Sequence, residues 1–157
     1  MYGEEDRERN EEDDTIVKLM FVKSHQDNAS IGLLLVRIPL GIIFIAHGWM
    51  KLLGMAKTIV FFGTLGLAPA FAYLVAGVEF LGGLALLFGI LTRPAGAILA
   101  FDMLMAIAMV KIKANFIGGF EFEFLLLFAS LGLAYLGAGK FSIEGYGVES
   151  RIMNYEL

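Results

Sequence analysis

Residues 31–53 read IGLLLVRIPLGIIFIAHGWMKLL. The run is long and almost entirely apolar, and only Arg37, His47 and Lys51 carry ionisable side chains. About 20 consecutive apolar residues are enough to cross the hydrocarbon core of a bilayer as a helix. The run therefore predicts a transmembrane helix, with Pro39 either in its first turn or at a kink.

Three further apolar windows follow: Pro69–Leu91, Pro94–Ile112 and Phe120–Leu136. Two of them begin with proline, which suits the first helical position because the N–H that it lacks would be unpaired there anyway. A soluble helical protein would need polar faces, which these runs do not have. Short connections make the helices antiparallel neighbours with both termini on one side. The predicted fold is all-α, a membrane-spanning antiparallel four-helix bundle.

The composition and the charge distribution narrow the class further. The chain is 58% hydrophobic and 18% charged, against about 45–50% and about 25% in soluble domains. Nine of the 16 acidic residues precede residue 30, so the net charge of −4 belongs to the N-terminal segment. A nearly neutral body without a basic stripe argues against binding to nucleic acid. The absence of cysteine excludes disulfides, iron–sulfur clusters and Cys-ligated zinc, and no metal site is predicted.

The chain divides into three predicted segments. Residues 1–29 form an acidic N-terminal tail, which is expected to be disordered at its start because it cannot bury enough apolar surface. Within it, residues 15–22 are apolar but too short to span, and they would form an interfacial helix or an arm on the bundle. Residues 30–144 are the transmembrane domain, and residues 145–157 are a short C-terminal tail.

The polar residues 24–30 separate the tail from the first span and predict that the span begins at Asn28 or Ser30. Basic residues near the ends of the spans are slightly more numerous on the side of the termini, which predicts cytoplasmic termini in a cell (plasma) membrane. On that side they are Lys18, Lys23, Arg93, Lys140 and Arg151, and on the other side Lys51, Lys57, Lys111 and Lys113.

Four ionisable residues fall well inside the predicted spans. A charge in hydrocarbon is costly, so each must face the bundle interior and find a partner. At a rise of about 1.5 Å per residue, the depths from the terminal side are roughly 9 Å for Arg37, 12 Å for Asp102, 18 Å for Glu79 and 24 Å for His47. We therefore predict one buried network of Arg37, Asp102 and Glu79 with His47 at its far edge, as a candidate ligand-binding site. Lys51, Glu121 and Glu123, nearer the span ends, are secondary candidates.

Other interpretations of these residues remain open. A buried cluster of arginine and carboxylates can fix the register of the helices without binding anything. Lysines near span ends can extend to the membrane surface as anchors, which applies to Lys51, Lys111 and Lys113. His47 could be an interior imidazole with a hydrogen-bond partner, a proton carrier or a ligand. The sequence assigns no catalytic residue.

A set of spaced motifs in this chain resembles the DoxX/DoxD-like family of membrane proteins, from about Gly32 to Glu144. The first motif is Arg37-x3-Gly41-x2-Phe44-x2-His47-Gly48-x2-Lys51, and the second is Glu79-x2-Gly82-Gly83-x5-Gly89-x2-Thr92-Arg93. The third is Gly118-Gly119-Phe120-Glu121, and the last is Gly137-Ala138-Gly139-Lys140-Phe141-Ser142-Ile143-Glu144. The family usually has Asp at the final position, where this chain has Glu144. The preceding Gly-Gly-Phe favours Glu121 over Glu123 as the family's acidic residue in the fourth helix.

The resemblance implies a four-helix membrane bundle and leaves the function open. Some members of the family are subunits of a thiosulfate:quinone oxidoreductase, and others are linked to membrane oxidoreductase complexes that answer oxidative stress. More distant relatives include cargo receptors of the eukaryotic secretory pathway. A shared fold does not by itself carry a shared function.

Three functions follow as hypotheses. The first is a subunit of a quinone-linked redox complex in which the polar site binds a quinone or similar carrier; with no intrinsic cofactor evident, a partner subunit would supply the electrons. The second is a transporter or receptor for a small amphipathic ligand, which would call for a homo-oligomer. The third is a non-catalytic membrane scaffold or assembly protein with the acidic tail as its docking segment.

Overall fold

The computed structural model describes residues 2–147, and it describes side chains from residue 16 onward except Leu19. Most of the predicted C-terminal tail, residues 148–157, lies outside the described part. Every regular element in that part is helical. The elements are α1 (Tyr2–Leu53), α2 (Met55–Thr64), α3 (Pro69–Phe88), α4 (Thr92–Ala106), the π-helical turns η1 (Ile107–Lys111) and η2 (Phe116–Phe120), and α5 (Glu121–Leu136).

Four helical segments are long and apolar enough to cross a membrane, which confirms the predicted fold class. They are Ile16–Leu53, Pro69–Phe88, Thr92–Lys111 and Phe116–Leu136. Only 28% of the most apolar window in each of the first three, and 17% in the fourth, is buried within the protein. Large apolar side chains such as Leu35, Phe101 and Leu125 are instead exposed. Such faces are stable against acyl chains and not against water.

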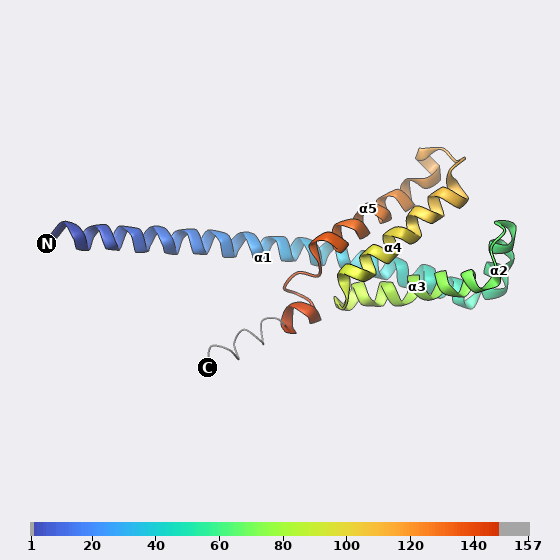
Figure 1. Cartoon of the computed structure of the whole chain (residues 1–157), viewed down its shortest axis with the longest axis horizontal. Coiled ribbons are helices and arrows are strands. Elements are labelled where there is room, and N and C mark those ends of the chain that lie inside the picture. Colours follow the sequence, from blue (N-terminus) through green and yellow to red (C-terminus); the bar gives the residue numbers. More distant parts are fainter. Residues whose placement is uncertain (1, 148–157) are drawn as a thin grey trace.

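The four spans form two helical pairs. α1 packs along α3, and α4 packs along α5, with smaller contacts between the pairs. The pairs meet near the side of the termini and diverge toward the opposite side, where α2 turns back across the end of the first pair (Figure 1). We call that opposite side the far side. With ten residues, α2 is too short to span, and the sequence interpretation did not identify it.

α1 is longer than the first predicted span. It continues through residues 24–30 without a break, so the prediction that a helix begins at Asn28 or Ser30 is wrong. Ser30 keeps its place in the helix by donating its hydroxyl to the carbonyl of Gln26 at 2.9 Å, a bond that a helical serine makes to the preceding turn. The backbone of residues 2–14, for which the composition predicts disorder, forms the first turns of α1. Glu and Arg are good helix formers.

The polar stretch of α1 is where the chain docks after its last span. The Lys140 backbone N–H donates to the Ser30 hydroxyl at 3.3 Å, and the Lys140 ammonium lies 2.7 Å from the Asp27 carboxylate. A Cβ on Gly139 would come within 3.3 Å of the Ser30 Cα. Polar residues therefore mark this part of α1 because the segment after α5 binds to it.

The first helical pair depends on glycines at the crossing of α1 and α3. A Cβ on Gly48 would lie 2.5 Å from the Phe80 backbone nitrogen. A Cβ on Gly83 would lie 2.7 Å from the Ile45 backbone nitrogen and 2.8 Å from the Gly41 carbonyl oxygen. Small residues at such positions let membrane helices approach closely enough for backbone contact.

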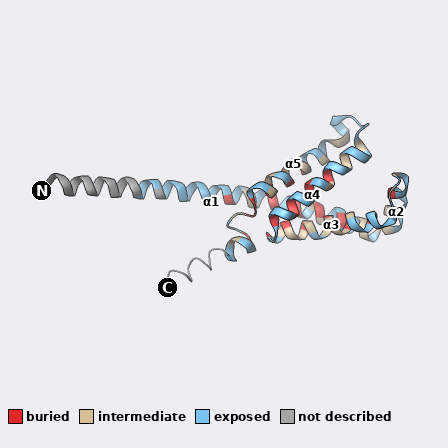
Figure 2. Ribbon diagram, viewed as in Figure 1, coloured by how far each residue is buried: buried red, intermediate tan, exposed pale blue. Residues whose placement is uncertain are grey.

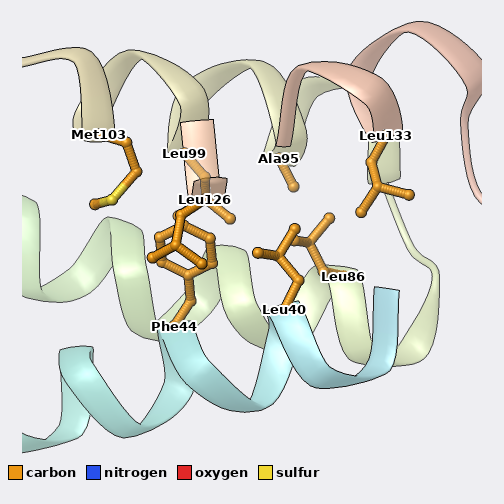
Figure 3. Close-up of a cluster of buried hydrophobic side chains, with 8 residues drawn as sticks. All are labelled: Leu40, Phe44, Leu86, Ala95, Leu99, Met103, Leu126 and Leu133. Carbon is orange, nitrogen blue, oxygen red and sulfur yellow. The ribbon is translucent and has the colours of Figure 1, made fainter. Parts of the chain in front are cut away.

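The apolar core fills the half of the bundle nearest the termini. Eight buried side chains from all four spans converge there (Figure 3). They are Leu40, Phe44, Leu86, Ala95, Leu99, Met103, Leu126 and Leu133. Figure 2 shows buried residues gathered where the spans meet, whereas the projecting part of α1 is exposed where it is described. The core thus fills the terminal half of the bundle and fixes the positions of the four spans, whose far ends form the other half.

Candidate functional site: a charged cavity in the far half of the bundle

A cavity of about 450 Å³ lies in the far half of the bundle. Small-molecule sites commonly occupy roughly 300–1,000 Å³. Its walls are mostly apolar and come from α2, the first turns of α3, the end of α4 and η1. The apolar lining residues are Phe61, Phe62, Leu65, Leu67, Phe71, Leu74, Val75, Val78, Ile98, Phe101, Met105, Ala106, Met109 and Val110. Five charged residues complete the lining, so the cavity is amphipathic.

Lys51, Glu79 and Asp102 form the deeper charged group of this cavity. The Lys51 ammonium donates a short hydrogen bond to Glu79 Oε2. Glu79 is only 2% exposed, whereas the Lys51 side chain is 29% exposed, so the ion pair lies at the edge of the protein interior. Asp102 lines the same cavity and lies within electrostatic reach of Lys51 and Glu79. One lysine therefore faces two carboxylates, and the formal charge of the group is −1.

Lys111 and Glu123 form a second charged group on the same cavity. Lys111 Nζ lies 2.6 Å from Glu123 Oε1 and donates a hydrogen bond of 3.0 Å to the carbonyl of Gly119. Lys111 ends η1, the turn in which α4 widens into a π-helix. Turns of this kind are frequent at functional sites. This ion pair links the end of η1, which continues α4, to the first turn of α5.

The local sequence explains how Lys51 and Glu79 meet. Glu79 lies on the face of α3 that is buried, together with Ala76 and Gly83 at helical spacing. Side chains of a helix tilt toward its N-terminus. α1 and α3 are antiparallel, so Lys51 tilts inward from the far side and Glu79 tilts outward toward it. Lys51 lies nearer the far side than Glu79, and the opposite tilts of the two side chains bring their charged groups together.

The predicted pairing of Arg37 with Asp102 and Glu79 is wrong. Arg37 donates from Nη1 to the Ala138 carbonyl and from Nη2 to the Phe141 carbonyl, each at 2.7 Å. Helical side chains tilt toward the N-terminus of their helix, so Arg37 on α1 tilts toward the terminal side and away from the two carboxylates. The partners of this buried charge are backbone oxygens of the segment after α5.

Arg37 connects several segments at the terminal end of the bundle, and we call this set of contacts the Arg37 staple. It is 2% exposed and lies against Gly89, where φ is +67° and a Cβ would come within 2.5 Å of Nη1. The Gly89 carbonyl accepts a hydrogen bond of 3.2 Å from the Glu144 backbone N–H. The guanidinium thus joins α1, the end of α3 and the returning chain, without the Asp102 and Glu79 carboxylates that the sequence interpretation placed beside it.

The remaining predicted residues fall into different places. His47 is exposed and its ring lies 6.0 Å from that of Phe122; it does not line the cavity. Glu121 is exposed and accepts a hydrogen bond of 3.1 Å from the Gly118 backbone N–H, which holds the turn before α5. Of the two acids at the start of α5, Glu123 lines the cavity and Glu121 does not.

The sequence interpretation gave too little weight to the lysines. Lys51, a secondary candidate, is the direct partner of Glu79, and Lys111, interpreted as a surface anchor, pairs with Glu123. The spacing gave a signal for Lys51, because it continues the stripe of Arg37, Gly41, Phe44 and Gly48 along α1. No comparable pattern marked Lys111, whose position depends on the π-helical turn.

Among the described residues, no group of three or more His, Cys, Asp or Glu could hold a metal ion. The charges of the cavity form ion pairs between Lys51 and Glu79 and between Lys111 and Glu123. The class of protein is therefore a multi-pass helical membrane protein with an internal amphipathic site.

Comparison with known proteins places this membrane protein in a family. The sequence profile of the DoxX family matches residues 32–112. A relative in Bacillus subtilis (strain 168), named "Putative oxidoreductase CatD", is 43% identical over 116 residues, which cover 74% of this chain and 87% of the relative. The "Inner membrane protein YqjF" of Escherichia coli (strain K12) is 36% identical over 117 residues, covering 73% and 90%. The chain belongs to the DoxX family. No solved structure matches it.

Proposed function

We propose that this chain is the membrane subunit of a redox complex and that its far-side cavity binds a quinone or a similar lipophilic carrier. The observation that carries the proposal is the cavity itself, an apolar volume of about 450 Å³ with charged side chains in its wall. A quinone has the matching form, with an apolar body and two carbonyl oxygens that accept hydrogen bonds. The name of the Bacillus subtilis relative supports a redox role.

The charged residues could serve such a carrier in two ways. Lys51 uses one of its three N–H groups on Glu79, which leaves donors for a carbonyl oxygen of the head group. Glu79 and Asp102 together carry one more charge than Lys51 neutralises, and a proton held between them would make the group neutral. Burial of an uncompensated charge is costly, so this group is suited to take up a proton and pass it to a reduced carrier.

Reduction of a quinone to a hydroquinone takes two electrons and two protons. In this proposal a partner subunit delivers the two electrons, and the Lys51–Glu79–Asp102 group holds the first proton beside the accepting oxygen. The same group takes up the second proton from water at the far side through the partly exposed Lys51. α2 and the apolar ends of α3 and α4 keep water from the head group. The chain contributes binding, orientation and proton transfer, and the partner contributes the electron source.

Binding is tested with purified protein in lipid nanodiscs and decylubiquinone as the probe. Equilibrium titration against empty nanodiscs separates specific binding from partition into lipid. We expect saturable binding by the wild-type chain and at least tenfold weaker binding by Glu79→Gln. Glu121→Gln is the matched control, because it removes the same charge at an exposed position outside the cavity. Size-exclusion chromatography checks that each variant is folded.

Two results would overturn the proposal. Binding no greater than that of empty nanodiscs would leave the cavity without a quinone function. Equal binding by wild type and Glu79→Gln would remove the charged group from the site. Native mass spectrometry of the protein extracted from its own membrane provides an independent check, since a retained quinone is expected and another amphipathic molecule would favour a transporter or receptor.

A further inference from the structure

The cavity wall contains buried hydrogen-bond acceptors that are not satisfied within the protein. Two of its acids have a buried carboxylate oxygen with no hydrogen-bond partner, Asp102 Oδ2 and Glu123 Oε2. Both residues line the cavity, and the other oxygen of Glu123 is bound to Lys111. The buried cavity atoms without partners are thus both acceptors, since a carboxylate oxygen accepts. The remaining N–H groups of Lys51 can serve an oxygen of the head group in either redox state, because a carbonyl oxygen and a hydroxyl oxygen both accept.

Buried polar groups are nearly always hydrogen-bonded, so a pair of orphan acceptors at one cavity needs an explanation. A molecule bound in the cavity would satisfy them if it carried hydroxyl or amine hydrogens. The oxidised and reduced forms of a quinone differ in this property. A quinone presents two carbonyl oxygens, which only accept, and a hydroquinone presents two hydroxyl groups, each of which donates.

We infer that the cavity binds the hydroquinone form of its carrier more tightly than the quinone form, with Asp102 and Glu123 as the acceptors that read the two hydroxyl groups. This inference rests on the proposed function, because it names the redox state that the same site prefers. Hydroxyl-to-carboxylate hydrogen bonds belong to the strong, charge-assisted class. The quinone form would instead place carbonyl oxygens near carboxylate oxygens and gain no such bonds there.

A preference for the reduced form changes what the site does to its carrier. By linkage, tighter binding of the hydroquinone raises the reduction potential of the bound couple. Each tenfold ratio of dissociation constants corresponds to about 30 mV for a two-electron couple. The bound quinone becomes a stronger oxidant than the free quinone in the lipid. The site is therefore built to receive electrons from its partner rather than to donate them.

The inference is tested by titrating the wild-type protein in nanodiscs with decylubiquinol and with decylubiquinone under anaerobic conditions. We expect the hydroquinone to bind at least tenfold more tightly. Asp102→Asn and Glu123→Gln should each lower that ratio severalfold, because an amide can turn its N–H₂ toward a carbonyl oxygen. Glu121→Gln, on the same helix as Glu123 but outside the cavity, should leave the ratio unchanged.

The outcomes separate this inference from the function on which it rests. Absence of specific binding by either form contradicts the proposed function. Specific binding of both forms with equal affinity, or tighter binding of the quinone, overturns the redox-state preference and leaves the proposed function standing. A wild-type preference that survives in both carboxamide variants would remove Asp102 and Glu123 from the role given to them. Glu123 lies near the end of its span, so its variant provides a second test if Asp102→Asn does not fold.

Discussion

The two halves of the bundle use buried charge in opposite ways. In the terminal half, Arg37 binds two backbone carbonyls of the same chain, and apolar side chains fill the space around it. In the far half, lysines and carboxylates bind one another around a cavity. The comparison indicates that a charge in a membrane bundle can be structural or can form a site. What distinguishes them is whether the surrounding volume is filled.

The largest effect should come from breaking the closed half. Arg37→Leu removes both donors to the Ala138 and Phe141 carbonyls and separates the returning chain from α1. A hydrogen bond to a charged group contributes about 1.5–3 kcal/mol, so the loss of both bonds costs about 3–6 kcal/mol. We expect the variant to lose its folded fraction in mild detergent, measured by size-exclusion chromatography after heating. A melting temperature within a few degrees of wild type would show that the staple is not needed.

A somewhat smaller effect is expected at the glycine crossing that holds the first pair. Gly83→Ala forces a Cβ against the backbone of α1, and overpacking of this kind costs about 1–3 kcal/mol. Gly77→Ala is the matched control, since it lies on the same helix and its Cβ would have nothing within 4 Å. The control should be neutral or stabilising by up to about 1 kcal/mol. Equal melting temperatures for the two variants would contradict the close approach of α1 and α3.

The two halves should also respond differently to one and the same substitution. Ala95→Leu adds volume to the filled core and should destabilise by about 1–3 kcal/mol. Ala106→Leu adds the same volume to the cavity wall, where space exists, and should leave the melting temperature nearly unchanged while it weakens decylubiquinone binding. Thermal stability and titration of both variants make the test. Equal destabilisation would mean that the cavity is not free volume.

The smallest effect belongs to the exposed ion pair at the base of the bundle. Lys140 and Asp27 have side chains that are 42% and 44% exposed, and surface pairs contribute only about 0.2–1 kcal/mol. Lys140→Ala should therefore shift the melting temperature by no more than a few degrees, and 0.5 M salt should shrink the shift further. A decrease in melting temperature as large as that of Arg37→Leu would mean that this ion pair, rather than Arg37, holds the returning chain against α1.

The spans could be predicted from the sequence because the length and apolarity of a membrane helix are local properties. α2 could not, because ten apolar residues between two spans have no distinctive pattern. The partner of Arg37 was mispredicted because depth along a helix axis says nothing of the direction in which the side chain tilts. It also says nothing of a loop that returns to offer carbonyls. Glu79 and Asp102 line one cavity, but the cation beside Glu79 is Lys51 and not Arg37. The rule that intramembrane acids converge on a countercharge therefore did not identify the partner.

The contacts of Arg37 also set an order of events during biosynthesis. Its two partners lie 101 and 104 residues further along the chain, beyond all the other spans. At roughly 5–20 residues per second, a ribosome needs about 5–20 s to deliver them. For that interval the first helix must reside in or beside the insertion machinery with an unmatched guanidinium. A nascent chain arrested before Phe141 would keep Arg37 in that state, so the assembly of this protein in the membrane is completed by the segment after its last span rather than by its first span.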